Sequence, residues 1–172
     1  MDRKLPDKLL TAAAVAALLC AVTVIITILY LRGAFLPGWI KWNRERAEKL
    51  PEGLEDRLEP SWLIQDALCF DIDGDGADDS ILLVWKRGNY GKYMPTWVRH
   101  NEWGFSQHIF IYSLRDDGWH PIWMSSRLGM QTVSFDKGDI IPGTDRISLD
   151  LTGTDGRVSR WGWLTWGLTR VE

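Results

Sequence analysis

The stretch ALCFDIDGDGADDSILLVWKRG, residues 67–88, decides the fold of this chain. It contains an apolar strand, a short loop rich in glycine and aspartate, and a second apolar strand, an order typical of a β-hairpin. The stretch TVSFDKGDIIPGTDRISLDLTG, residues 132–153, has the same order. In both, Phe-Asp ends the first strand and another aspartate (Asp79 or Asp145) precedes the second. The spacing of about 65 residues predicts an internal repeat.

Short apolar runs and Gly/Asp turns continue on both sides of these stretches, which is the pattern of an all-β domain. Glycine-containing turns at residues 115–118 and 154–156 predict two further hairpins. The sequence thus predicts a mainly β domain over residues 61–172, with repeats at about 62–130 and 131–172. Its expected strands are residues 62–70, 80–86, 107–114, 119–125, 131–135, 146–151, 157–163 and 167–171.

The segment FDIDGDG at residues 70–76, with Asp78, Asp79 and an apolar strand after it, resembles the FG-GAP (integrin α-type, VCBS-like) repeat of β-propellers. The resemblance covers about twenty residues strongly and the last hundred weakly. It implies a calcium-binding loop between the first two strands of a propeller blade. Two repeats cannot close a propeller, which needs about four blades. We therefore expect a small antiparallel domain of two propeller-blade-like repeats, either self-contained or assembled with another copy.

The loop itself has the composition of a calcium site. Calcium takes six to eight oxygen ligands at about 2.3–2.6 Å, and alternating aspartates in a tight glycine turn can direct their carboxylates inward. An EF-hand is excluded, because its twelfth loop position would be Leu82 and a strand precedes the loop. The predicted ligands of a structural Ca²⁺ are Asp71, Asp73, Asp75, the carbonyl of Ala77, and Asp79.

The alternative is a polar turn that binds no ion. Five aspartates lie within residues 71–79, and their mutual repulsion favours the cation. The corresponding loop of the second repeat has Asp136, Asp139 and Asp145 but also Lys137, so we expect it to have lost the metal.

Residues 9–31, LLTAAAVAALLCAVTVIITILYL, contain no charge, proline or glycine. As a helix they are roughly 34 Å long, enough to cross a hydrocarbon core of about 30 Å. A cleaved signal peptide is the rival interpretation, but the stretch is long for one and has no small-x-small site. Its AALLC segment resembles a lipoprotein box, but Leu19 is too large for the position before Cys20. The sequence predicts a single-pass transmembrane helix after a short tail, residues 1–8.

The signals for the orientation of this helix in the membrane conflict. Basic residues after the span slightly outnumber those before it, which favours a cytoplasmic C-terminus. The short basic N-terminal tail is typical of a signal anchor, and a calcium loop suits a calcium-rich compartment. We expect a cell-membrane protein with an extracytoplasmic β domain. Residues 32–60, rich in Arg, Glu, Lys and Leu, predict a helical charged linker, either a solvated stalk or a partner-binding helix.

The long connection at residues 87–107 is rich in aromatic side chains. Such loops often bind ligands, and a carbohydrate or peptide can stack on the rings. The alternative is that the rings cover one end of a small sheet. The candidate ligand-binding residues are Tyr90, Tyr93, Trp97, Trp103 and Phe105, with Arg99 for polar contacts.

Other candidate sites have weaker support. His108 and His120 lie on consecutive expected strands and can meet as a metal pair, but packing is the simpler expectation without a third ligand. Glu102 with Asp116 or Asp117 is a conceivable glycosidase pair, although no motif supports it. Trp161 and Trp163 share one strand face, as a buried ladder or as a binding platform.

These observations predict a membrane-anchored binding or structural module with a calcium-stabilised loop. The alternatives are a membrane-tethered hydrolase acting on glycans and a subunit of an envelope assembly with no ligand of its own. The formal net charge of −3 argues against nucleic acid as a partner. The lipid bilayer is an expected partner, a carbohydrate or protein partner is possible, and oligomerisation would complete the propeller. No nucleophile with an adjacent base occurs in a recognisable motif, so catalysis is not expected.

Overall fold

The computed structural model describes residues 7–90 and 96–171. The chain divides into two compact units, Met1–Leu36 and Pro37–Glu172. The division falls well before residue 61, where the sequence analysis begins the β domain. Residues 37–60 therefore belong to the same unit as the strands.

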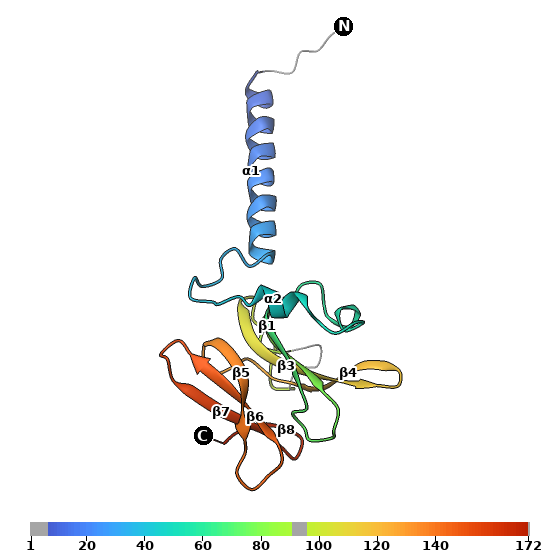
Figure 1. Cartoon of the computed structure of the whole chain (residues 1–172). Coiled ribbons are helices and arrows are strands. Elements are labelled where there is room, and N and C mark those ends of the chain that lie inside the picture. Colours follow the sequence, from blue (N-terminus) through green and yellow to red (C-terminus); the bar gives the residue numbers. More distant parts are fainter. Residues whose placement is uncertain (1–6, 91–95, 172) are drawn as a thin grey trace. The chain divides into compact units, whose positions relative to one another are not determined.

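The first unit contains helix α1 (Asp7–Leu31), drawn in blue in Figure 1. Its residues Thr11–Leu31 are long and apolar enough to span a membrane, and nearly all of their side chains are exposed. The hydroxyls of Thr23 and Thr27 donate to backbone carbonyls one turn earlier, at 2.9 and 2.8 Å. These two polar groups therefore need no water, which suits a helix surrounded by lipid.

The second unit contains two four-stranded antiparallel sheets (Figure 1). Each sheet follows the chain order, β1-β2-β3-β4 in one and β5-β6-β7-β8 in the other. The predicted fold class, a helix followed by an antiparallel β domain in two halves, is confirmed. The strands are β1 (Leu63–Phe70), β2 (Asp79–Arg87), β3 (Phe105–Arg115), β4 (Gly118–Met124), β5 (Thr132–Ile140), β6 (Ile147–Gly153), β7 (Val158–Leu164) and β8 (Gly167–Arg170).

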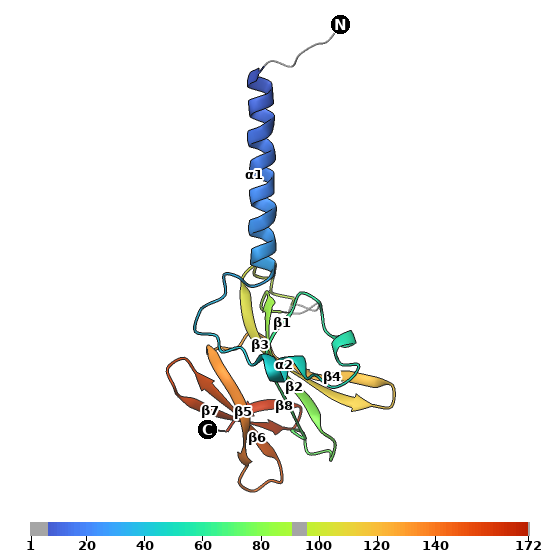
Figure 2. The same ribbon diagram turned by 45° about the horizontal axis from the view of Figure 1, so that its top comes forward.

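The two sheets pack against each other through one face of each, and they lie side by side in both Figure 1 and Figure 2. Because successive strand residues point to opposite faces, Ile81 and Leu83 of β2 reach this core while Leu82 and Val84 point away. Leu149 and Leu151 of β6 face them from the other sheet. Burial of these side chains is the main apolar contribution to the stability of the domain.

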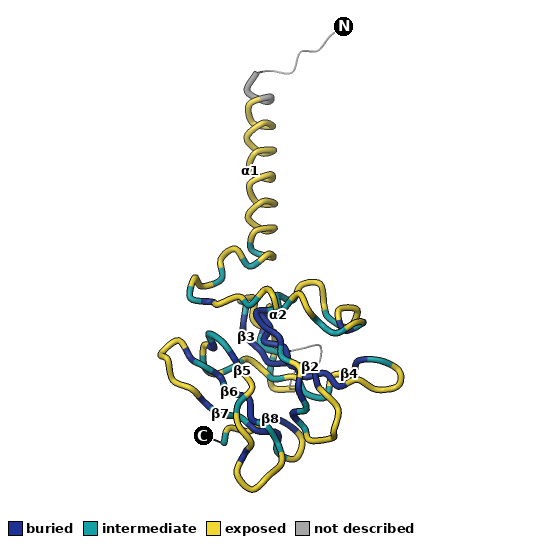
Figure 3. Tube along the Cα trace, viewed as in Figure 1, coloured by how far each residue is buried: buried dark blue, intermediate teal, exposed yellow. Residues whose placement is uncertain are grey.

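The second face of the β1–β4 sheet is covered by residues 50–62, and this corrects the expectation of a solvated stalk. Leu54 is fully buried in a cluster with Leu82 and Val84. The indole N–H of Trp119 donates to the carbonyl of Glu52 at 3.0 Å. Figure 3 shows much of β2 and β3 in the dark blue of buried residues. The helical pieces between residue 37 and β1 are short: α2 (Arg44–Glu48), which precedes the cover, and a 3₁₀ turn (Glu55–Arg57) within it.

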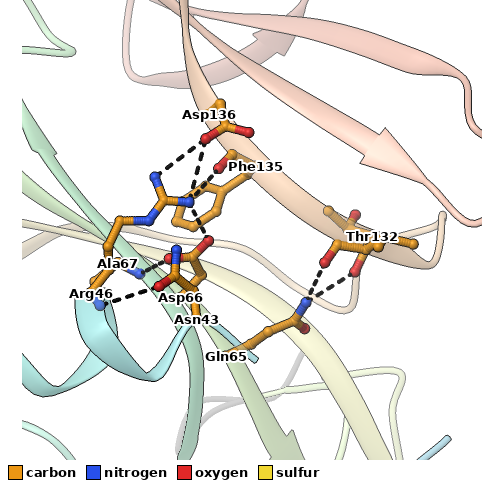
Figure 4. Close-up of polar contacts among 9 residues, drawn as sticks. Asn43, Arg46, Gln65, Asp66, Ala67, Thr132, Phe135 and Asp136 are labelled. Atoms are coloured by element: carbon orange, nitrogen blue, oxygen red, sulfur yellow. Dashed lines mark hydrogen bonds and ion pairs between the residues drawn. The ribbon is translucent and has the colours of Figure 1, made fainter. Parts of the chain in front are cut away.

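A buried polar network joins the two sheets (Figure 4). The amide oxygen of Gln65 accepts hydrogen bonds from Trp85 and Gln107, both at 2.7 Å. Gln107 in turn donates to the carbonyl of Thr132 at 2.7 Å and accepts from its N–H at 2.8 Å. Gln65 also donates to the carbonyl of Val133 at 2.8 Å. These bonds set the start of β5 against β1 and β3.

Arg46 makes a second polar connection, from α2 to both sheets (Figure 4). Its guanidinium lies 2.6 Å from the carboxylate of Asp66 in β1 and 3.3 Å from that of Asp136 in β5. The Asp66 side chain is only 3% exposed. Burial raises the pKa of Asp66, and the hydrogen bond and charge of Arg46 oppose that rise. The ion pair thus compensates the charge of a buried acid, whose other oxygen accepts from the N–H of Ala67 at 2.8 Å.

Replacing Arg46 with alanine is expected to lower the free energy of unfolding by about 1–3 kcal/mol, since the buried Asp66 loses its charged partner. Lys49→Ala in the same helix is the matched control. It removes an exposed pair with Glu45, which is worth about 0–0.5 kcal/mol. Urea denaturation of the full chain in detergent measures both. Equal effects from the two substitutions would contradict a stabilising role for Arg46.

Candidate metal site

The acidic loop follows β1 and leads into β2, as the sequence predicts. Two residues at the start of the loop fix it to the domain: Phe70, the last residue of β1, and Ile72 are buried in the core between the sheets. Asp71 and Asp73 lie on either side of Ile72 in the sequence. Both aspartates are partly exposed, while Asp79 at the end of the loop is buried.

Three of the predicted ligands converge. Asp71, Asp73 and Asp79 each place one carboxylate oxygen within 4.8 Å of the others. Oxygens at this spacing can share one cation. Among the residues that the structure describes, these three aspartates form the one group of acidic side chains with this property. Asp75 is not a member of this group, and its Oδ1 accepts a hydrogen bond from the N–H of Ala77 at 2.8 Å.

The loop backbone wraps around Asp71. One carboxylate oxygen accepts from the N–H groups of Gly74 and Asp75 at 2.7 and 3.2 Å, and the other accepts from Gly76 at 2.9 Å. Gly74 and Gly76 have φ of +79° and +92°, which a side chain would disfavour. The predicted role of these glycines in the turn is therefore confirmed.

Asp79 is the unusual member of the group. It is fully buried, its Oδ2 accepts from the N–H of Ile72 at 3.2 Å, and its Oδ1 has no hydrogen-bond partner of ordinary geometry. Burial raises the pKa of Asp79 to about 6, and the charge of Asp73 adds to the rise. The pKa of Asp73 is also raised, by burial first and then by the charge of Asp75. A nearby positive charge would favour the ionised form of both carboxylates.

Arg146, from the segment between β5 and β6, lies against the loop and was not foreseen. Its side chain would lie 3.3 Å from a Cβ atom added to Gly74. Its guanidinium donates to the carbonyl of Trp163 at 2.6 Å. Its charge lowers the pKa of Asp73, as the weakest of the contributions to that group. Arg146 therefore brings the second half of the domain to the edge of the acidic loop without neutralising it.

The corresponding part of the second repeat is built differently. The expected strand 131–135 continues to Ile140, with a register irregularity after Lys137, so Asp136 and Asp139 lie on β5 rather than in a loop. Asp136 pairs with Arg46 and Asp139 lies 3.5 Å from Arg160. These acids are thus paired with arginines and do not form a group like that of the first loop.

The aromatic candidates divide by exposure. Trp97 and Trp103 are 82% and 81% exposed, whereas Tyr90 and Phe105 are half-buried. Arg99 is exposed and Tyr93 lies outside the described residues. Side chains as exposed as the two indoles are not enclosed between protein surfaces, so they do not form a preformed stacking cleft.

The two histidines do not meet. His108 is buried in β3, where its Nε2 lies 2.7 Å from Ser106 and its Nδ1 lies 3.1 Å from the carbonyl of Ser125. Burial lowers the pKa of His108 to about 4. His120 lies 2.7 Å from Asp117. Packing, and not a shared metal, accounts for His108.

The carboxylates considered for glycoside hydrolysis lie at opposite ends of β3. Glu102 precedes this strand, and Asp116 and Asp117 follow it in the β3–β4 turn. Eleven residues of strand separate them by about 30 Å, whereas such pairs stand about 5–9.5 Å apart. This pair is therefore excluded. Trp161 and Trp163 both pack against the core between the sheets, as the ladder interpretation expects.

No protein-family model, no curated protein and no solved structure matches this chain.

The raised pKa of Asp79 predicts how stability depends on pH without metal. Between pH 4 and 6 the folded state binds more protons than the unfolded chain, so this contribution to stability falls as pH rises. The loss is at most about 3 kcal/mol for a shift of about two pKa units. Asp79→Asn lacks this dependence of stability on pH, because the asparagine side chain does not titrate.

The measurement is the difference in unfolding free energy between wild type and Asp79→Asn in chelator, from pH 4 to pH 7. His108 makes an opposite contribution, since its lowered pKa destabilises the fold as pH falls. Both proteins share it, so it cancels. We expect Asp79→Asn to become more stable relative to wild type as pH rises. A difference in unfolding free energy that does not change with pH would contradict the raised pKa of Asp79.

Proposed function

We propose that this chain is a membrane-anchored β domain with a calcium-stabilised loop, acting as an extracytoplasmic binding or structural module. The observation that carries the calcium proposal is the convergence of the buried Asp79 with Asp71 and Asp73, together with the Asp79 Oδ1, which accepts no hydrogen bond. A buried carboxylate oxygen without a hydrogen-bond partner is costly, and a divalent cation shared with two further carboxylates would offset that cost.

The competing interpretation is a polar turn without an ion. The three backbone N–H bonds to Asp71 suit such a turn, because short polar side chains commonly bond nearby backbone groups. They do not account for Asp79, whose Oδ1 remains without a partner. Calcium prefers oxygen ligands in a flexible shell. The carbonyl of Ala77 and the carboxylate of Asp75 are the proposed additional ligands from the chain.

A structural role for the ion fits the position of the loop. Ile72 enters the core in the middle of the acidic segment, and Asp79 pairs with Phe70 at the first rung of the β1–β2 ladder. A cation here would fix the end of this hairpin against the core. Because the site would exist only in the folded chain, the free energy of ion binding would add to the stability of the fold.

The FG-GAP-like interpretation of the two halves is part of the proposal. Each half is a four-stranded antiparallel sheet in chain order, which is the arrangement of a propeller blade. The first half has the acidic loop between its first two strands, where this repeat would place it. The halves pack face to face through their apolar sides, and this supports a self-contained pair of blades over an incomplete ring.

Calcium is expected to raise the thermal midpoint of the full chain, with a stabilisation of about 2.7 kcal/mol at a concentration one hundred times Kd. Asp73→Asn should abolish the increase. Asp78→Asn is the matched control, since Asp78 is exposed and outside the converging group. Calorimetry with calcium and with chelator measures all three proteins. An unchanged midpoint for wild type would remove the metal proposal.

The orientation is tested with a natural reporter, the exposed free thiol of Cys69. A membrane-impermeant maleimide should label Cys69 in intact cells if the domain is extracytoplasmic. Burial and the charges of Asp78 and Asp79 raise the pKa of this thiol, so labelling is run at mildly alkaline pH. Cys69→Ser is the control for specificity. Labelling only after the membrane is permeabilised would place the domain in the cytoplasm.

A further inference from the structure

Residues 96–104 connect to β3 and carry two of the most exposed large side chains of the domain. Trp97 is 82% and Trp103 81% exposed. Arg99 and His100, between them, are exposed too. Large apolar side chains clustered on a surface mark a place of interaction. The position of this segment on the domain indicates what it contacts.

The segment is attached firmly to the end of the β1–β4 sheet. The side-chain oxygen of Asn101 accepts from the N–H groups of Asn89 and Tyr90 at 2.7 and 3.2 Å, and its amide donates to the carbonyl of Tyr90 at 2.8 Å. The N–H of Gly88 donates to the carbonyl of Gly104 at 2.9 Å. The base of the connection is therefore closed at the end of β2 and the start of β3.

The chain arrives from the N-terminal helix at the same end of this sheet. The N–H of Asn43 donates to the carbonyl of Gln65 at 2.9 Å. The ring of Trp39 lies 5.9 Å from that of Trp85, and Trp85 pairs with Gln107 near the start of β3. Nine peptide steps separate Leu31, the last residue of α1, from the buried Ile40. Chain connectivity alone limits their separation to about 30 Å.

We propose that Trp97 and Trp103 dock into the headgroup region of the lipid bilayer that holds α1, so that the domain binds the membrane surface directly. This inference rests on the membrane anchor proposed above. The indole ring has an apolar body and a polar N–H, and it is favoured at the boundary between headgroups and hydrocarbon. The short covalent connection keeps the local concentration of lipid high, so weak contacts suffice.

The charges of the segment suit an anionic lipid surface. Arg99 is exposed, as is Arg87 at the end of β2. The acidic residue of the segment, Glu102, lies 3.8 Å from Arg127. Each basic residue near an anionic bilayer contributes about 1 kcal/mol to binding. The two indoles and two arginines have the composition that interfacial protein segments use.

The test uses the full chain in vesicles of phosphatidylcholine and phosphatidylglycerol, with an environment-sensitive fluorophore on single cysteines in a Cys69→Ser background. Native Cys20 reports on the anchor. Thr96→Cys, with Cys20→Ala, reports on the aromatic segment. Trp166→Cys, with Cys20→Ala, is the control. Trp166 is 81% exposed and lies in the β7–β8 turn, at the opposite end of its sheet from Thr132.

A lipid that carries a spin label near its headgroup should quench the fluorophore at position 96 several-fold more than that at position 166. Trp97→Ala with Trp103→Ala should reduce quenching at position 96 to the level of the control. Trp166→Ala should leave quenching at position 96 unchanged. The thermal midpoint of each variant is measured in parallel, so that a loss of docking is distinguished from a loss of stability.

The outcomes separate the two proposals. Quenching of the Cys20 label by a mid-chain spin label establishes the anchor. If that label is quenched and position 96 behaves like position 166, the docking proposal is wrong and the anchor stands. Quenching at position 96 that persists without the two indoles also overturns the docking proposal. An unquenched Cys20 label overturns both.

Discussion

The central constraint on this domain is that the β1–β4 sheet must be covered on both faces. Eight consecutive residues of β2 are buried, a pattern seen where neither face of a strand meets water. Leu83 points to one face and Leu82 to the other, and each lies in a different apolar cluster. The second sheet supplies one cover and residues 50–62 supply the other. Each cover is then fixed by polar contacts that apolar packing alone does not specify.

Those contacts explain why the acidic loop occurs in only one half of the domain. In the second half Asp136 faces Arg46 and contributes to the junction between α2 and the sheets. In the first half Asp71 faces its own backbone, and Asp79 lies buried beneath it. Two similar sequences thus make different contacts, because Asp136 faces α2 while Asp71 bonds to its own loop. An internal repeat of sequence does not require a repeat of chemistry.

The sequence predicted the strands well because their signals are local. Apolar runs bounded by glycine and aspartate identified all eight, and Gly118 and Gly156 occupy the expected turns with positive φ. The extension of β5 to Ile140 was missed because Lys137 and Asp139 make its second half polar. An exposed stretch of strand has little apolar pattern to detect.

The cover of residues 50–62 over the second face of the β1–β4 sheet was also missed, although a periodic pattern of leucines indicated it. A leucine occurs at every fourth position in Leu50, Leu54 and Leu58. Leu54 is buried in the apolar cluster on this face, and the other two pack against that cluster. The surrounding charges and Pro51 favoured a solvated linker. The contacts of Gln65 and Arg146 were not predictable, because each depends on residues more than fifteen positions away. For the acidic loop, composition predicted the converging carboxylates, but not that Asp75 would bond to the Ala77 N–H instead.

The attachment of α2 has a mechanical consequence. Tension applied to the chain from its N-terminal side reaches the Asn43–Gln65 hydrogen bond and the Arg46 ion pairs before it reaches β1. Arg46 contacts Asp66 of β1 and Asp136 of β5, so part of the load passes to the second sheet at the point of entry. A free stalk would deliver the same pull directly to β1, an edge strand held by β2 alone within its sheet, and would peel it away rung by rung.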